Sequence, residues 1–223
     1  MTKPLILATG FDVFPGAPEN PTAWAIGALA QRNWQPAAAR LETAVLPVTF
    51  DMWERHALPL IRTLKPMAVI AFGLSAKTTG FTLESTARNA IAMDQPDFSG
   101  QCALDDCVSR AGPPFHPSGL PLTEIAKALH RAGLPIVRSD DAGDYLCNML
   151  FYQLMHTATE TGIRSAGFIH VPYLTSQIER LRSQGREIAH GASLDESLML
   201  SGVKTIIETC AVHLAPSASG HLA

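Results

Sequence analysis

Short apolar runs alternate with longer segments of helical spacing along most of this chain. Runs at residues 4–9 and 67–72 are each closed by a glycine, and a third at 165–171 is also uninterrupted, so all three are expected as buried strands. Further strands are expected at 41–48 and 135–138, and helices at 21–31, 50–64 with a kink at Pro59, 122–132, 143–161 and 194–214. This alternation predicts an α/β fold with a twisted, mostly parallel central sheet and helices on both faces.

Residues 80–119 break the alternation. They are rich in Gly, Pro, Ser and Asp, which predicts an irregular insertion that could include a hairpin. No linker-like stretch divides the chain, so we expect a single domain over residues 1–215, followed by a frayed tail at 216–223. In parallel sheets, functional sites gather at the carboxyl ends of strands, which directs attention to the loops after the apolar runs.

Composition argues against several classes of partner. A net charge of -3 without a basic stripe argues against nucleic acid, and no apolar run reaches membrane-spanning length. The apolar stretch near the N-terminus is too short for a signal peptide, so a cytoplasmic location is expected. The 4 cysteines do not make a disulfide framework in a chain of 223 residues. Cys102 and Cys107 fit no common zinc spacing, and we expect no metal.

Cys147 is the first candidate for chemistry. It follows the turn signal Ala142-Gly143 at the expected start of a helix, where the helix dipole favours a thiolate. Ser139 or Asp141 is expected to cap this helix. The alternative is a buried structural thiol, since free cysteine is among the most buried residue types. The neighbouring aspartates would oppose ionisation of the sulfur, so a cationic partner is needed.

His170 and Glu84 are candidates for the two groups that would activate this cysteine. His170 lies near the end of an apolar strand, where it could pair with the thiolate, although a hydrogen-bonded core histidine is the alternative. Glu84 lies between apolar or small residues in a segment poor in acids and could orient the imidazole, whereas a solvated strand carboxylate is its alternative.

The loop after the first strand carries two phenylalanines, Phe11 and Phe14, among Gly and Pro. Loops seldom expose large apolar rings, so these two either fill the core or form an apolar slot for a flat, uncharged ligand. The loop lacks the glycine spacing and the lysine of a phosphate-binding loop.

Five segments together resemble the motifs of pyroglutamyl-peptidase I, a family of cysteine peptidases that removes N-terminal pyroglutamate. The segments are Thr-Gly-Phe-Asp-Val-Phe-Pro-Gly at 9–16 followed by Asn-Pro-Thr at 20–22, Leu-Pro-Val at 46–48, Glu84 with Ala87 and Asn89, Ala-Gly-Asp-Tyr-Leu-Cys-Asn at 142–148 with Tyr152, and Phe-Ile-His-Val-Pro at 168–172. They occur in order, and the resemblance runs from residue 5 to about residue 200.

The resemblance implies Cys147 as nucleophile, His170 as general base and acid, and Glu84 as the orienting carboxylate. It also implies an α/β fold, no cofactor, small peptides with a blocked N-terminus as substrates, and a homo-oligomer, either dimer or tetramer. The side chains that it implies around the pyrrolidone ring are Phe11, Phe14, Tyr145 and Leu146, with the backbone at Leu74 available to a lactam.

Two positions depart from the family pattern. Leu74 stands where bacterial members commonly have glutamine, and Asp94 stands where they commonly have an arginine. Three other functions therefore stay open: a related cysteine hydrolase of another small amide or lactam, a non-catalytic binding protein with the same fold, and, by fold analogy alone, a purine-phosphorylase-like enzyme.

Overall fold

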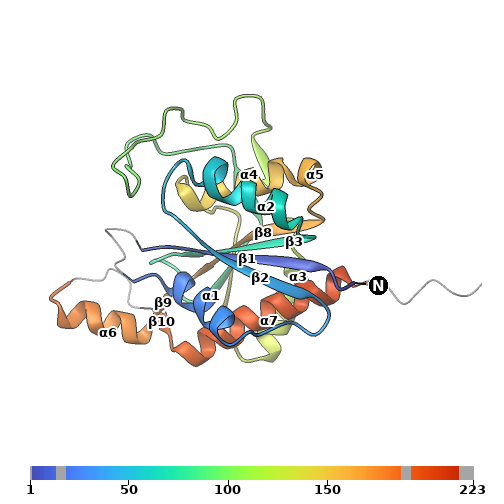
Figure 1. Ribbon diagram of the computed structural model, residues 1–223. Helices are drawn as coiled ribbons and strands as arrows, with labels where there is room; N and C mark the ends of the chain where they lie inside the picture. The colour runs from blue at the N-terminus through green and yellow to red at the C-terminus, as the bar shows by residue number, and fades with distance from the viewer. Residues whose placement is uncertain (1, 14–18, 187–191, 216–223) are drawn as a thin grey trace, which may run out of the picture.

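A six-stranded sheet forms the centre of the protein (Figure 1). The structure, a computed structural model, describes residues 2–13, 19–186 and 192–215. The strands are ordered β2-β1-β3-β8-β4-β7. Their bounds are β1 Leu5–Phe11, β2 Arg40–Leu46, β3 Ala68–Leu74, β4 Phe81–Glu84, β7 Ile136–Ser139 and β8 Ser165–Val171. The first four in spatial order run parallel, whereas β4 pairs antiparallel with β8 and parallel with β7.

Helices cover both faces of this sheet (Figure 1). On one face lie α1 (Pro21–Gln31), α3 (Leu122–Arg131) and α7 (Glu196–Leu214); on the other lie α2 (Leu58–Leu64), α4 (Leu146–His156) and the short α5 (Ala158–Thr161). Strands β1 and β8 are buried along their whole length, as expected for strands covered on both faces. Two large hydrophobic cores result, one on each side of the sheet. The expected single-domain α/β fold with a mostly parallel sheet is confirmed.

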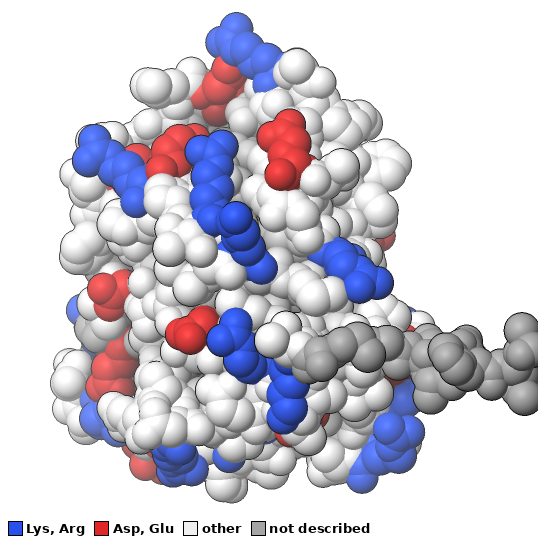
Figure 2. All heavy atoms as spheres, turned by 45° about the vertical axis from the view of Figure 1, so that its right-hand side comes forward, with Lys and Arg blue, Asp and Glu red and all other residues white. Residues whose placement is uncertain are grey.

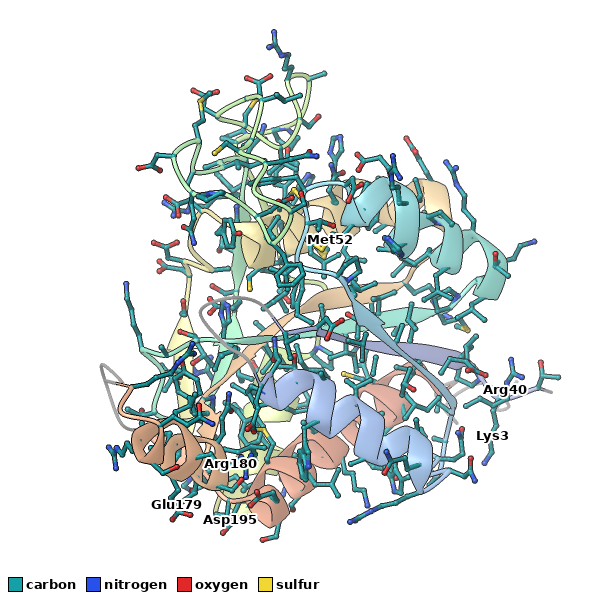
Figure 3. All side chains as sticks on the ribbon, turned by 60° about the vertical axis from the view of Figure 1, so that its left-hand side comes forward. Lys3, Arg40, Met52, Glu179, Arg180 and Asp195 are labelled. Carbon is teal, nitrogen blue, oxygen red and sulfur yellow. The ribbon has the colours of Figure 1, made fainter. Side chains whose placement is uncertain are left out.

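The helix starts explain where several elements begin. Asn20 caps α1 by accepting a hydrogen bond from the Thr22 N–H at 3.0 Å, and Pro21 occupies the first turn, where its missing N–H costs nothing. Asp195, labelled in Figure 3, caps α7 through the Leu198 N–H at 2.8 Å. These caps and the glycine-closed strands are local signals, which is why the sequence predicted these elements well.

The insertion at 80–119 is more ordered than expected. Its first piece, β4, joins the central sheet, and β5 (Thr86–Arg88) pairs antiparallel with β6 (Phe115–Pro117). The segment between β5 and β6 contains no helix or strand in the described structure and extends beyond α4 (Figure 1). It is anchored by the carboxylate of Asp97, which accepts hydrogen bonds from the Phe50, Ser99 and Gln101 N–H groups. Although burial opposes its ionisation, these bonds lower the pKa of Asp97.

Other elements differ from expectation. The predicted helix at 143–161 begins only at Leu146 and breaks at Thr157, and Pro59 lies in the first turn of α2 after a π-helical segment, Trp53–Ala57, rather than at a kink. Sequence analysis missed helix α6 (Thr175–Ser183) and the small parallel pair β9 (Tyr173–Leu174) and β10 (Ser193–Leu194). Helix α6 is polar, and an ion pair between Arg180 (Figure 3) and Glu19 attaches it to the residues preceding α1.

Two observations concern the partners that composition argues against, nucleic acid and membranes. Basic and acidic side chains are interspersed on the face shown in Figure 2, with uncharged surface between them. Among the described residues no helix is both long and apolar enough to cross a bilayer. The proposed tail at 216–223 lies outside the described residues.

Candidate active site

Cys147 is the second residue of α4, on the core side of the helix start. Tyr145 occupies the N-cap position, and its side chain makes no capping hydrogen bond within the described part of the chain. The expected caps are wrong: the Ser139 hydroxyl bonds to Asp141, and Asp141 accepts the Gly143 N–H at 2.9 Å. The chain turns into the helix at Gly143, whose φ of 85° favours glycine. The first N–H groups of α4, which have no partner within the helix, therefore begin beside the sulfur.

His170 is the titratable group that interacts with this thiol. It is the penultimate residue of β8 and is only 7% exposed. Its Nδ1 lies 2.7 Å from Glu84 Oε1, and Cys147 is close enough to influence the pKa of its ring. Burial alone would lower the pKa of His170, but the hydrogen bonds to Cys147 and Glu84, and the negative charge that each can carry, raise it to about 9. The imidazole is therefore largely protonated at neutral pH.

Glu84 reaches His170 because β4 enters the sheet beside β8. In the antiparallel register, Thr82 is opposite His170, and Glu84 ends β4 two residues later. Its side chain is 3% exposed, so its hydrogen bond to His170 is shielded from water. A buried carboxylate is costly unless it is paired, and His170 provides that pairing. The solvated-carboxylate alternative is thus excluded for Glu84.

Gly73 makes room for the sulfur. It is opposite His170 in the parallel register of β3 and β8. A Cβ at this position would lie 3.0 Å from Cys147 Sγ and 2.6 Å from the tip of Phe168. Only glycine lets the start of α4 pack this closely on the sheet. Sequence analysis treated Gly73 as a strand end, because the helix that it accommodates lies far along the chain.

The five predicted substrate-binding residues are in different environments. Phe11 is buried at the end of β1, with its ring 6.3 Å from that of Phe168, which in turn lies 4.9 Å from the His170 ring. Leu146 is 1% exposed in the core, and Leu74 packs against the cluster of Tyr173, Ile178 and Leu181. Phe14 lies outside the described residues. Their roles as ring contacts stay predictions.

Tyr145, the fifth of these residues, lies within electrostatic reach of the thiol. Burial, followed by the charges of Asp97, Cys147 and Cys102, raises its pKa to about 12. Its hydroxyl donates to the Pro96 carbonyl at 2.8 Å, and its ring meets Phe50 edge-on. Tyr145 therefore fastens the insertion to the start of α4.

Two described features bear on metals. Asp105, Asp106 and Cys107 offer three possible ligand atoms within 4.8 Å of one another. However, Asp105 is already paired with Arg110 at 2.5 Å, and clusters of exposed acids are common without a metal. Cys102 is exposed, and both it and Cys107 are free thiols.

Comparisons with known proteins agree with this geometry. A model of the family described as pyroglutamyl peptidase matches residues 4–213. The chain belongs to the pyroglutamyl peptidase family. It is 32% identical over 207 residues to pyrrolidone-carboxylate peptidase 1 of Ralstonia nicotianae, covering 92% of each chain. It is 33% identical over 204 residues to the pyrrolidone-carboxylate peptidase of Pyrococcus furiosus, covering 91% of this chain and 96% of that one.

Solved structures of this family share the fold. A mutant pyrrolidone carboxyl peptidase from the hyperthermophile Pyrococcus furiosus superposes with a TM-score of 0.85 at 31% identity, covering 94% of this chain and 99% of that one. The resemblance inferred from five sequence motifs is thereby confirmed, as is the assignment to a family of hydrolases. Within this family frame, the described geometry brings together Cys147, His170 and Glu84.

Proposed function

We propose that this protein is a cysteine exopeptidase that removes an N-terminal pyroglutamyl residue from peptides. The observation that carries the proposal is the buried hydrogen bond between Glu84 and His170, together with the position of Cys147 close enough to His170 to raise the pKa of the imidazole. A nucleophile, a base within hydrogen-bond reach and a third group that orients the base are the signature of covalent catalysis. Membership of the pyroglutamyl peptidase family supplies the substrate class.

In the proposed reaction, the Cys147 thiolate attacks the carbonyl that joins the pyroglutamyl ring to the next residue. The tetrahedral oxyanion accepts hydrogen bonds from the unpaired N–H groups at the start of α4, and one such donor is typically worth about 3 kcal/mol. His170, protonated at neutral pH, delivers its proton to the leaving amine as the thioester forms. It then takes a proton from the water that releases pyroglutamate, while Glu84 holds the ring in position throughout.

The surroundings of the thiol suit an uncharged lactam better than a free amino terminus. Phe168 and the backbone of Gly73 adjoin the sulfur, and both are uncharged. Glu84 is bonded to His170, so it is not free to receive an ammonium group. An amide ring needs only shape and neutral hydrogen bonds, whereas an ammonium group would need an acidic partner.

Hydrolysis of pyroglutamyl-aminomethylcoumarin tests this proposal. We expect turnover by the wild type, little turnover of the prolyl analogue, and a loss of at least about a thousandfold in Cys147→Ala. Cys102→Ala is the matched control, because Cys102 is an exposed thiol on the insertion, and it should keep full activity. Full activity in Cys147→Ala would overturn the proposal. Prolyl or other amides cleaved in preference would instead favour the related hydrolase, with Leu74 and Asp94 as the residues to examine.

The assembly and location expected for the family remain part of this proposal. A homo-oligomer, dimer or tetramer, in the cytoplasm would cover some of the large apolar side chains that the insertion exposes, namely Met93, Phe98, Leu104 and Phe115. Light scattering of the purified protein should give a mass that is two or four times the 23.9 kDa of one chain. A monomer at micromolar concentration would refute the oligomer without affecting the chemistry.

A further inference from the structure

Asn148 joins the strand that follows Glu84 to the helix that carries Cys147. Its side chain is completely buried, and it is adjacent to the nucleophile in the chain. The Arg88 N–H donates to Asn148 Oδ1 at 2.8 Å, and Asn148 Nδ2 donates to the carbonyls of Arg88 at 2.8 Å and Ala90 at 2.9 Å. These bonds fix the backbone of Arg88, the last residue of β5, against the first turn of α4.

From this fixed position the Arg88 side chain reaches the turn that precedes α4. Its Nη2 lies 2.6 Å from Asp141 Oδ1 and donates to the Gly143 carbonyl at 3.3 Å. Asp141 also accepts the Gly143 N–H, so one guanidinium holds both ends of the turn. The Arg88 Nε is buried with no hydrogen-bond partner among the described residues. An unpaired buried donor destabilises the folded state, and Nη2 makes its two contacts despite this cost at Nε.

The contacts of Arg88 also bring a positive charge to the turn that precedes Cys147. The charged and titratable groups next to the start of α4 are His170 from β8, which is bonded to Glu84 of β4, Tyr145 at the N-cap, Arg88 from β5 and, in the turn before the helix, the exposed residues Asp140, Asp141 and Asp144. In general, negative charges near a thiol disfavour the thiolate, whereas positive charges favour it. Arg88 therefore offsets the negative charge of Asp141 directly. Asp141 is one of the aspartates that would oppose ionisation of the Cys147 sulfur.

We propose that Arg88 is a positioning residue for Cys147, which shapes the turn before α4 and neutralises Asp141 so that the thiolate persists at neutral pH. The proposal deepens the proposed peptidase function and rests on it for its catalytic consequence. It also gives a role to Arg88, a positively charged residue in the same segment as Asp94, where the family commonly has an arginine. Arg88 acts through Cys147 and through the backbone of Gly143, and it takes no proton itself.

The rate of iodoacetamide alkylation at Cys147, followed across pH by peptide mass spectrometry, measures the thiolate without any substrate. Arg88→Met keeps much of the apolar stem and removes the charge. We expect alkylation at pH 7 to slow about threefold to tenfold, with the pH profile displaced upward. The double variant Arg88→Met/Asp141→Asn should return to within about twofold of the wild type, because the charge that needed neutralising is gone. On the peptide substrate, Arg88→Met should lower kcat and leave KM nearly unchanged.

Arg110→Met is the matched control, since it removes an arginine from an exposed pair with Asp105 elsewhere on the insertion. It should leave the alkylation profile unchanged. An Arg88→Met profile identical to that of the wild type would overturn the proposal, and so would a double variant as slow as the single one. Arg88→Lys adds a second check, because it should alkylate faster than Arg88→Met if charge matters. A protein that fails to cleave pyroglutamyl substrates but shows these alkylation shifts would refute the proposed function and leave the role of Arg88 intact.

Discussion

Replacing Glu84 by glutamine removes one negative charge from a buried hydrogen bond and changes the side-chain shape very little. In the wild type, Glu84 Oε1 and His170 Nδ1 lie 2.7 Å apart, with the two side chains 3% and 9% exposed. Glutamine can still offer an oxygen to the imidazole N–H. The substitution therefore isolates the charge from the geometry.

The magnitude follows from the titration of His170. Its pKa rises from the ordinary value of 6.5 to about 9, which corresponds to about 3 kcal/mol in favour of the imidazolium. Glu84 and Cys147 share this effect and must also overcome burial. Loss of the Glu84 charge should therefore cost about 1–2 kcal/mol, and the population of the thiolate–imidazolium pair should fall about tenfold.

Two assays measure this effect. NMR titration of the His170 ring should give a pKa well below about 9 in Glu84→Gln, and kcat for a pyroglutamyl amide should fall at least about tenfold. Glu208→Gln is the control, because Glu208 accepts an exposed hydrogen bond from the Ala37 N–H on the far face of the sheet. A folded Glu84→Gln protein in which His170 titrates as in the wild type would show that the charge of Glu84 does not raise the pKa of His170.

Three further predictions concern packing, pH and thiol access. Gly73→Ala should lower activity more than tenfold and stability by about 1–3 kcal/mol in urea unfolding, because its Cβ would meet Phe168 and Cys147 Sγ; wild-type activity would contradict the close packing. Asp97→Asn should destabilise the fold at pH 7 by about 1–2 kcal/mol. The pKa of Asp97 in the folded state lies below its ordinary value. The stabilisation by Asp97 is therefore fully present above the ordinary pKa and disappears as pH falls through the folded-state pKa. Equal destabilisation at pH 7 and pH 2 would be contrary evidence. Burial raises the pKa of Cys210 to about 12, so at pH 8 iodoacetamide should label Cys102 and leave Cys210 unmodified until the protein unfolds.

Local signals in the sequence predicted the parts of the fold that depend on them. Three apolar runs became the buried strands β1, β3 and β8, and helix α1 begins where the Asn-Pro pair marks its cap. The short strand β4 was less visible, because its partner β8 follows about eighty residues later in the chain. Helix α6 was missed since it is mostly polar and is attached through Glu19 rather than through a broad apolar face.

The site also combines residues that local sequence signals mark with residues whose contribution depends on tertiary contacts. Cys147 and His170 stand at recognisable helix and strand ends, and Glu84 stands out as a carboxylate between apolar or small residues; the family motifs agree with all three. The contributions of Gly73 and Arg88 depend on which elements meet in space. Gly73 is needed because α4 packs on β3, and Arg88 reaches the turn before α4 because Asn148 ties β5 to the same helix. Phe11 and Leu146 carried apolar signals, but the structure buries both in the core.

Intact-protein and peptide mass spectrometry of the enzyme during turnover shows whether Cys147 forms the acyl-enzyme. After rapid acid quenching with a pyroglutamyl ester substrate, we expect a pyroglutamyl group on the peptide that contains Cys147, and its disappearance as the substrate is consumed. Turnover by an enzyme whose Cys147 never carries the acyl group, or carries it only when His170 is replaced, would exclude Cys147 as the nucleophile.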